Sequence, residues 1–221
     1  LNINSSYAAI YTPDLQIRDE FTDKLRYIAP SGHVGSTYAY TDTNAETWFS
    51  PAGINRGQMY NIQGLRVAYE QADRDLLSPS QVNAIISKPG KGWVVWDDQT
   101  LQAMASSLSY VHVRRLLILI EVSLVDALDF QVFNPNDAFT RFQIVQMVNN
   151  FLQPIKNGRG LYRFLVVCDD TNNTNDTVSQ GQLNVDVYLD PVLQVRAIKL
   201  QSIITATGAN FAELVAASAN A

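Results

Sequence analysis

The sequence predicts an α+β protein in which a mixed β-sheet is covered by helices, a two-layer α/β sandwich-like arrangement. Two observations carry this prediction. Apolar residues recur at helical spacing in two long segments, 108–128 and 142–152. Segments typical of strands lie between the predicted helices and cluster toward the C-terminal end, where 183–189 alternates apolar and polar residues.

The composition is that of an ordinary globular protein. Of the 221 residues, 47% are hydrophobic and 17% are charged. The only cysteine, Cys168, excludes an intramolecular disulfide, so packing must stabilise the fold, as expected for assembly in a reducing cytoplasm. The net charge of −5 gives no reason to expect nucleic-acid binding, and the longest apolar run, 116–120, is too short to cross a membrane. The first residue is Leu1, so we expect a fragment or a processed product.

Three elements are predicted before residue 64. Residues 6–17 are expected to form a strand or an extended segment. A helix is expected to begin after Pro30, with Ser31 as its N-cap. The stretch 50–64 is rich in Gly, Pro and Asn, which predicts a loop.

A second helix is predicted to begin at Ser78. Ser78 can cap it, Pro79 suits the first helical position, and Gln81 can complete a capping box. This helix would carry the apolar residues of 82–86 and stop at Pro89.

The remaining elements follow in order. Residues 92–96 predict a short buried strand, and 108–128 a helix with one buried face. The segment 134–137 combines a cap, a proline and an acidic first turn, which predicts a helix ending near Gly158. The buried stripe expected on that helix consists of Phe142, Val145, Val148, Phe151 and Leu152.

The C-terminal part is predicted to be rich in strands. Residues 163–168 are expected to form a core strand and 169–177 a polar loop. A half-buried strand is expected over 183–189, and a further strand over about 192–204. From Gly208 onward, we expect a short exposed tail with one small apolar helix.

Metal and phosphate sites find little support in the sequence. With only His33 and His112, and one cysteine, a His-rich or Cys-based metal site is excluded. The segment 88–93 lacks the spacing of a phosphate-binding loop, which favours a turn. Residues 169–176 offer oxygen ligands for calcium but not in the EF-hand order, which favours a solvated turn.

Three further groups were weighed for catalysis or anion binding. Cys168 with His33 or His112 as base is disfavoured, because a thiol at the end of an apolar strand is typical of a buried hydrophobe. Asp97 and Asp98 are adjacent acids at a strand end, which usually point apart and stay solvated. Arg114 and Arg115, beside Glu121, are expected to be structural ion-pair partners rather than an anion site. No catalytic constellation survives, which favours a binding or structural role.

Several segments, in order, resemble the conserved part of contractile bacteriophage tail sheath proteins, and together they span nearly the whole chain. These segments are 6–13 with Arg18 and Asp19; 30–34 with 38–42; 51–53 with Arg56 and Gly57; 92–96 with Thr100 and Leu101; 111–116; 133–137 with Phe151 and Leu152; 164–169 with Gly181 and Leu183; Asp190 and Pro191; and 205–208 with Phe211, Glu213 and Leu214. The sequence departs from the family pattern at Asp98, Gln99 and Asn134.

The resemblance implies a structural subunit and no enzyme. Sheath proteins of this family form hexameric rings, equivalent to a six-start helix, around a tail tube above a baseplate. Contraction drives the tube through the host envelope, and no cofactor is needed. The implied location is the virion tail, assembled in the bacterial cytoplasm, with self, tail tube and baseplate as partners and neither nucleic acid nor membrane among them.

The resemblance also implies an extended C-terminal arm that adds a strand to a neighbouring subunit. A core domain is then expected over 1–204 and the arm over 205–221. The residues expected to form the arm are Thr205, Gly208, Phe211, Glu213 and Leu214. The strand from which the arm leaves is expected to contain Val195, Ala197, Lys199, Gln201 and Ile203.

Other functions stay open on the sequence alone. One is the sheath of a related machine, a contractile bacteriocin or a type VI secretion apparatus. Another class is a baseplate-associated hydrolase that uses Asp97, Asp98 or Asp169, which would need paired carboxylates with separated pKa values in a cleft. A small-molecule binding module is the third.

Overall fold

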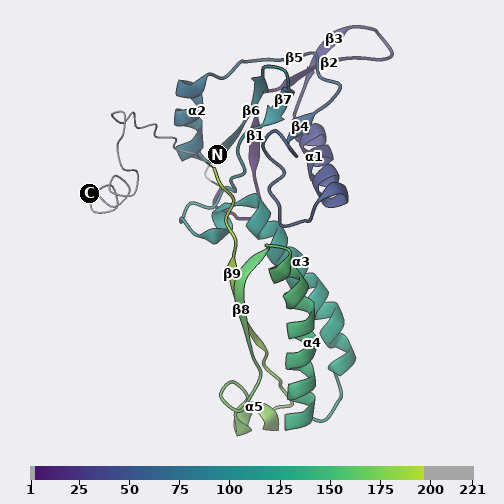
Figure 1. Ribbon diagram of the computed structural model, residues 1–221, viewed down its shortest axis with the longest axis vertical. Helices are drawn as coiled ribbons and strands as arrows, with labels where there is room; N and C mark the ends of the chain where they lie inside the picture. The colour runs from purple at the N-terminus through teal and green to yellow at the C-terminus, as the bar shows by residue number, and fades with distance from the viewer. Residues whose placement is uncertain (1–2, 197–221) are drawn as a thin grey trace, which may run out of the picture.

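A computed structural model of the chain describes residues 3–196. Figure 1 shows an elongated molecule with two lobes stacked end to end. We call residues 3–110 the sheet lobe and residues 111–191 the helical lobe. Helices and strands are interspersed along both lobes, which confirms the predicted α+β class.

The sheet lobe is built on a four-stranded mixed sheet. Its order is β1 (Ile10–Thr12), β6 (Val82–Lys88), β7 (Gly92–Val95) and β4 (Gln58–Met59). Strand β1 is parallel to β6, and the other pairings are antiparallel. The N-terminal strands, expected as one extended segment, thus divide between this sheet and a second one.

The second sheet has three antiparallel strands in the order β3 (Leu25–Ile28), β2 (Leu15–Arg18) and β5 (Gly64–Leu65). Helix α1 (Ser31–Asn44) packs against the strands of this lobe through a core that contains Leu15, Val34 and Ile85. The helix begins one residue after Pro30, which occupies the N-cap position that the sequence assigned to Ser31. The short helix α2 (Gln71–Leu77) lies at the opposite side of the lobe (Figure 1).

The prediction that a helix starts at Ser78 is wrong. Only a single 3-10 turn, Ser78–Ser80, forms there, and Gln81 then adopts a left-handed conformation with φ 60° that ends it. The chain continues as β6, whose residues 83–86 are all buried. A central strand that is buried on both faces shows a continuous apolar run, which sequence periodicity does not separate from a short helix.

The helical lobe contains two long antiparallel helices, α3 (Val111–Leu128) and α4 (Ala138–Asn157), joined through the 3-10 turn Asp129–Gln131. Both helices were predicted. The N-cap of α4 is Asp137, which accepts a hydrogen bond of 2.8 Å from the Thr140 amide, so the helix begins later than the cap pattern over 134–137 predicts. The C-cap is Gly158, as predicted.

The buried face of α4 differs in part from the predicted stripe. Val148 and Leu152 are fully buried, but the side chain of Phe142 is 61% exposed. Ile144 and Ile155 complete the core instead. The predicted stripe differs from the observed one because Phe142 lies outside the buried face of α4 and Phe151 lies only at its border, while aliphatic residues occupy its centre.

A two-stranded antiparallel sheet covers one side of the helix pair. It consists of β8 (Leu161–Val167) and β9 (Asp186–Pro191), linked by a polar loop that contains the short helix α5 (Asn175–Ser179). The structure therefore has three separate sheets where the sequence suggested one. The strand predicted over 192–204 is absent from its described part, 192–196, which has no regular structure.

Among the described residues, each lobe has its own core cluster, and Trp48 and Phe49 of the sheet lobe pack in the core of the helical lobe. The helical core contains Leu116, Ile144 and Leu152, and it also includes Trp48, which precedes both helices by more than sixty residues. The indole Nε1 of Trp48 donates a hydrogen bond of 2.9 Å to the Gly158 carbonyl. In the described part of the chain, no helix is long and apolar enough to cross a membrane.

Candidate interaction site at the C-terminal anchor

The predicted arm falls almost entirely outside the described residues. Val195 is the one predicted site residue that is described, and its side chain is 79% exposed in an irregular segment rather than a strand. Outside the described residues lie Ala197, Lys199, Gln201, Ile203, Thr205, Gly208, Phe211, Glu213 and Leu214, together with the tail and small helix expected from Gly208.

The described structure does show where the C-terminal segment is fastened. After β9, residues 192–196 run from the helical lobe up onto the sheet lobe (Figure 1). There the guanidinium of Arg196 bonds the carboxylate of Asp97 at 2.5 Å and lies 5.6 Å from the centre of the Tyr110 ring. We call Arg196 and its partners the C-terminal anchor.

The environment of Arg196 favours its charged form. Burial alone would lower the pKa of this guanidinium, but the carboxylate of Asp97 and the Tyr110 side chain outweigh it, so the pKa is raised. The Asp97 side chain is only 14% exposed, and its other oxygen accepts hydrogen bonds from Gln99 and Ser78. The anchor therefore pairs a largely buried carboxylate, held by several hydrogen bonds, with an arginine that is 42% exposed.

A cavity of about 890 Å³ opens beside the anchor. Its walls come from residues 50–56, α2, β6, residues 96–98, the start of α3 and residues 194–196. The cavity is bounded by both lobes and by the C-terminal segment, so any change in how they sit would reshape it.

Asp98, the neighbour of Asp97, points the other way and joins the lobes. Its carboxylate accepts a hydrogen bond of 3.2 Å from the Val111 amide and contacts Nδ1 of His112 at 2.7 Å. Both side chains are buried, and within the described residues Nε2 of His112 has no partner. Asp98 thus caps the N-terminus of α3 from a distant loop, where a negative charge suits the helix dipole.

The expectation for this acid pair was half right. Asp97 and Asp98 do point apart, but neither is solvated, because Asp97 pairs with the guanidinium of Arg196 and Asp98 with the imidazole of His112. Two acids that are separately engaged do not form the paired carboxylates that a hydrolase would need.

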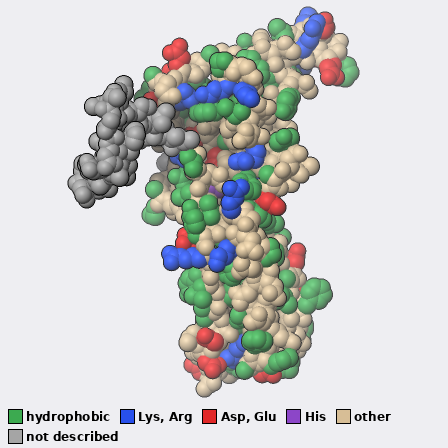
Figure 2. Space-filling model, viewed as in Figure 1, with side chains coloured by type: hydrophobic (Ala, Val, Ile, Leu, Met, Phe, Trp, Pro, Cys, Tyr) green, Lys and Arg blue, Asp and Glu red, His purple; other side chains and the backbone are tan. Residues whose placement is uncertain are grey.

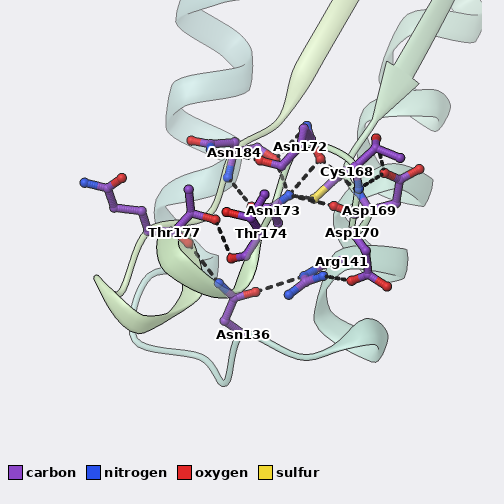
Figure 3. Close-up of polar contacts among 12 residues, drawn as sticks. Asn136, Arg141, Cys168, Asp169, Asp170, Asn172, Asn173, Thr174, Thr177 and Asn184 are labelled. Carbon is purple, nitrogen blue, oxygen red and sulfur yellow. Dashed lines mark hydrogen bonds and ion pairs between the residues drawn. The ribbon is translucent and has the colours of Figure 1, made fainter.

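The loop 169–177 is closed by its own side chains (Figure 3). The amide of Asn172 donates to the Val167 carbonyl at 2.9 Å and to the Asp186 carboxylate at 3.0 Å. Asn173, only 2% exposed, exchanges hydrogen bonds with the backbone of Asn184. These amides connect the ends of β8 and β9.

The side chains that could have bound calcium or acted as a nucleophile, Asp169 and Cys168, are engaged in hydrogen bonds within this loop. Among the described residues, no three His, Cys, Asp or Glu side chains are grouped as metal ligands. The carboxylate of Asp169 accepts from the Thr171 amide at 2.8 Å, within its own turn. Burial raises the pKa of the Cys168 thiol, and Asn173 is its hydrogen-bond partner. Cys168 follows β8 at the lower end of the helical lobe, whereas His112 lies in the first turn of α3.

The two arginines of α3 have separate structural partners. Arg115 bonds both carboxylate oxygens of Asp42 at 2.6 Å, not Glu121 as its position suggested. Arg114 donates to the Ser6 hydroxyl at 2.6 Å and lies over the Tyr7 ring. Arg115 was correctly predicted to be an ion-pair partner, whereas Arg114 has no carboxylate partner among the described residues.

The sheet of β8 and β9 offers a second contact surface. Within the described residues each strand pairs only with the other, so both outer edges carry unpaired backbone groups. Its outer face exposes Tyr162, Leu165 and Tyr188, each about 60% exposed. A two-stranded sheet is marginal by itself, and open edges are templates for a further strand.

Sequence reasoning missed the anchor residues Ser78, Tyr110 and Arg196. Ser78 was assigned to a helix cap, and Arg196 to a strand. No local signal identifies them, because Arg196 lies 99 residues from Asp97 along the chain.

Comparisons with known proteins agree with this architecture. Residues 104–205 match the model of the phage tail sheath C-terminal domain. The tail sheath protein of Vibrio phage KVP40 is 33% identical over 97% of this chain, and that of Enterobacteria phage T4 is 34% identical over 96%. The chain spans about a third of the length of these curated relatives, 32% in both cases.

Solved structures show the same fold. A chain of the anti-feeding prophage baseplate superposes with a TM-score of 0.82 at 22% identity, covering 92% of this chain and 56% of that one. A chain of the contracted sheath complex of the extracellular contractile injection system PVC gives a TM-score of 0.82 at 24% identity, covering 91% and 57%. The curated relatives are structural tail proteins, in agreement with the prediction that the chain is not an enzyme. The sequence identity to them, together with the matched C-terminal model, shows that the chain belongs to the tail sheath protein family.

Proposed function

We propose that the protein is a structural subunit of a contractile phage tail sheath, which polymerises around the tail tube and contracts to drive it through the host envelope. Its partners are further copies of itself, in hexameric rings or a six-start helix, together with the tail tube protein and the baseplate. The subunit acts in the virion tail after assembly in the host cytoplasm.

The observation that carries this proposal is the pair of open edges on the β8–β9 sheet. The sheet lies on the surface of α4, and within the described residues it ends in unpaired backbone on both sides. A strand from another subunit can hydrogen-bond there without any rearrangement of the fold. We assign the donor strand to the arm, residues 205–221, of a neighbouring copy, and residues 1–204 to the core domain that receives it.

The C-terminal anchor supports this assignment. The bond between Arg196 and Asp97 fixes the last described residues to the sheet lobe of their own subunit. Residues that follow such a fixed point leave from a defined place, which lowers the entropy cost of reaching a neighbour.

Sequence identity favours a phage sheath over the sheath of a related injection machine. The phage proteins are 33% and 34% identical to the chain, whereas the injection-system chains are 22% and 24% identical. The injection-system chains therefore support the fold, whereas the phage proteins support a sheath that belongs to a phage tail.

Deletion of residues 208–221 from the full-length protein tests the arm. We expect a folded protein that no longer forms sheath tubes, because the donor strand is gone. Circular dichroism reports the fold, and negative-stain electron microscopy reports the tubes. Deletion of residues 218–221 alone is the control, since it keeps Phe211, Glu213 and Leu214, and it should leave tubes. Tubes from the longer deletion would rule out the arm.

A further inference from the structure

Two arginines at the junction between the two lobes, which we call the waist, contact the same aromatic ring. The guanidinium carbons of Arg56 and Arg159 lie 5.1 and 5.6 Å from the centre of the Phe49 ring. Arg56 is partly buried and donates from Nε to the Ser50 carbonyl at 2.8 Å, which fixes its direction. We call Arg56, Arg159 and Phe49 the arginine pair.

The arginine pair carries uncompensated positive charge. Burial, followed by the repulsion of Arg159, lowers the pKa of Arg56. Among the described residues, neither guanidinium forms an ion pair with a carboxylate, although seven other arginines do. Guanidinium groups held in place by an aromatic ring are well suited to bind carboxylates.

The backbone at this site is unusual as well. Arg159 has a φ of 62°, in the left-handed region that side chains other than Gly, Asn and Asp seldom occupy. It directly follows the C-cap of α4, and its amide bonds the Lys156 carbonyl at 3.1 Å. A glycine would be the unstrained choice at this turn, so an arginine here indicates that its side chain is used.

The opposite charge gathers at the far end of the helical lobe. The turn between α3 and α4 and the loop between β8 and β9 meet there, where the Asn136 amide donates to the Gln182 carbonyl at 2.9 Å. The ion pair of Arg141 and Asp170, at 2.5 Å, joins the first turn of α4 to the same loop. Figure 2 shows acidic side chains at this lower end, with a basic one among them, and basic side chains along the middle of the molecule. We call the exposed residues of this end the acidic tip: Asp129, Phe130, Phe133, Asp137, Asp169, Asp170 and Asp176.

The acidic tip also exposes the Phe133 side chain, at a position where the backbone is strained. Phe133 is fully exposed, and its φ of 69° again lies in the left-handed region. The turn is fixed by Asn134, whose backbone and side chain both bond Gln131. An exposed phenylalanine in a strained, fixed turn gains nothing within its own subunit, and this pattern is typical of an interface anchor.

We infer that the acidic tip of one copy docks on the arginine pair of another. This inference deepens the proposed function, on which it rests, by naming one contact between subunits. The two surfaces are complementary in charge and lie on different parts of the molecule, so the contact is head-to-tail. A head-to-tail contact that does not close by rotation produces an open helical polymer, as a sheath requires.

Charge reversal in the full-length protein tests the contact. The first variant carries Arg56→Glu and Arg159→Glu, and the second carries Asp129→Arg and Asp176→Arg, two acids with no side-chain bond in the described residues. Attraction becomes repulsion in each, so we expect the concentration needed for tubes to rise at least about tenfold. Pelleting and negative-stain microscopy measure it. Lys91→Glu, which reverses an exposed lysine on the β6–β7 turn, is the control and should assemble like the wild type.

Mixing the two variants separates a lost contact from a misfolded protein. In an alternating polymer, each reversed arginine pair meets a reversed tip and each native pair meets a native tip, so the mixture should form tubes although neither variant does alone. The inference is overturned if the first variant assembles like the wild type, or if the mixture fails to assemble. If the wild type itself forms no tubes, the proposed function is wrong as well.

Discussion

At the scale of single residues, polar contacts between residues that are not neighbours in the sequence define the candidate site. Asp97 reaches Arg196, and Asp98 reaches His112 and the first amide of α3. Taken alone, each of these acids suggests a solvated turn, and no sequence pattern identifies the residue that pairs with it. The presence of acids after a strand was predictable, but their roles were not, because the roles depend on tertiary contacts.

The Asp98 cap should be a major contributor to stability. Asp98→Ala removes the carboxylate partner of the buried His112 and the negative charge at the N-terminus of α3, although the Val111 amide keeps its 3.0 Å bond to the backbone carbonyl of residue 98. We expect a loss of about 2–4 kcal/mol in the free energy of unfolding. Urea denaturation followed by circular dichroism measures it. Asp126→Ala, which removes an exposed acid from the same helix, should change the value by less than about 0.5 kcal/mol. Equal effects in the two variants would show that Asp98 is not a structural cap.

At the scale of elements, local patterns located the three long helices, but they missed the short helices α2 and α5 and located the strands unevenly. Helices α3 and α4 were predictable because their apolar spacing and caps are local features. Strand β6 was mistaken for a helix, since Ser78 and Pro79 provide a helix-start signal that only a 3-10 turn uses. The pairing of β1 with β6 joins residues more than seventy positions apart, which no local pattern reports.

The turn after α4 depends on Gly158 and Gly160, where a Cβ atom would come within about 3 Å of the Trp48 side chain. A Cβ atom at Gly158 would lie 2.8 Å from Cζ2 of Trp48, a rigid and buried ring. Gly158→Ala should therefore destabilise the protein by about 1–3 kcal/mol through overpacking. Gly35→Ala in α1 is the matched control, because a Cβ there meets nothing within 4 Å.

The two alanine variants should differ in sign. In a helix interior, replacing an exposed glycine by alanine stabilises by about 0.5–1 kcal/mol, so Gly35→Ala should raise the melting temperature. Gly158→Ala should lower it. A raised melting temperature in Gly158→Ala would mean that the indole moves aside at little cost.

At the scale of the whole molecule, the two lobes are separate in shape but not in packing. The family match covers residues 104–205, which contain the helical lobe. Yet this lobe takes Trp48 into its core and Asp98 onto the first turn of α3, and both residues lie outside that range. We therefore expect that the start of the matched segment, residue 104, is not a folding boundary in this chain.

A fragment of residues 104–205 tests this coupling. Loss of a buried tryptophan costs about 3–5 kcal/mol and loss of the Asp98 cap adds to it, against a total stability of about 5–15 kcal/mol for a typical domain. We expect the fragment to unfold at a much lower urea concentration than the whole chain, without a cooperative transition, and to bind a dye for exposed apolar surface. The whole chain with Trp48→Ala and Asp98→Ala should be weakened to a similar extent, since it lacks the same two contacts. A fragment that unfolds cooperatively at the midpoint of the wild-type chain would show that the helical lobe is independent and that Trp48 only fills a surface notch.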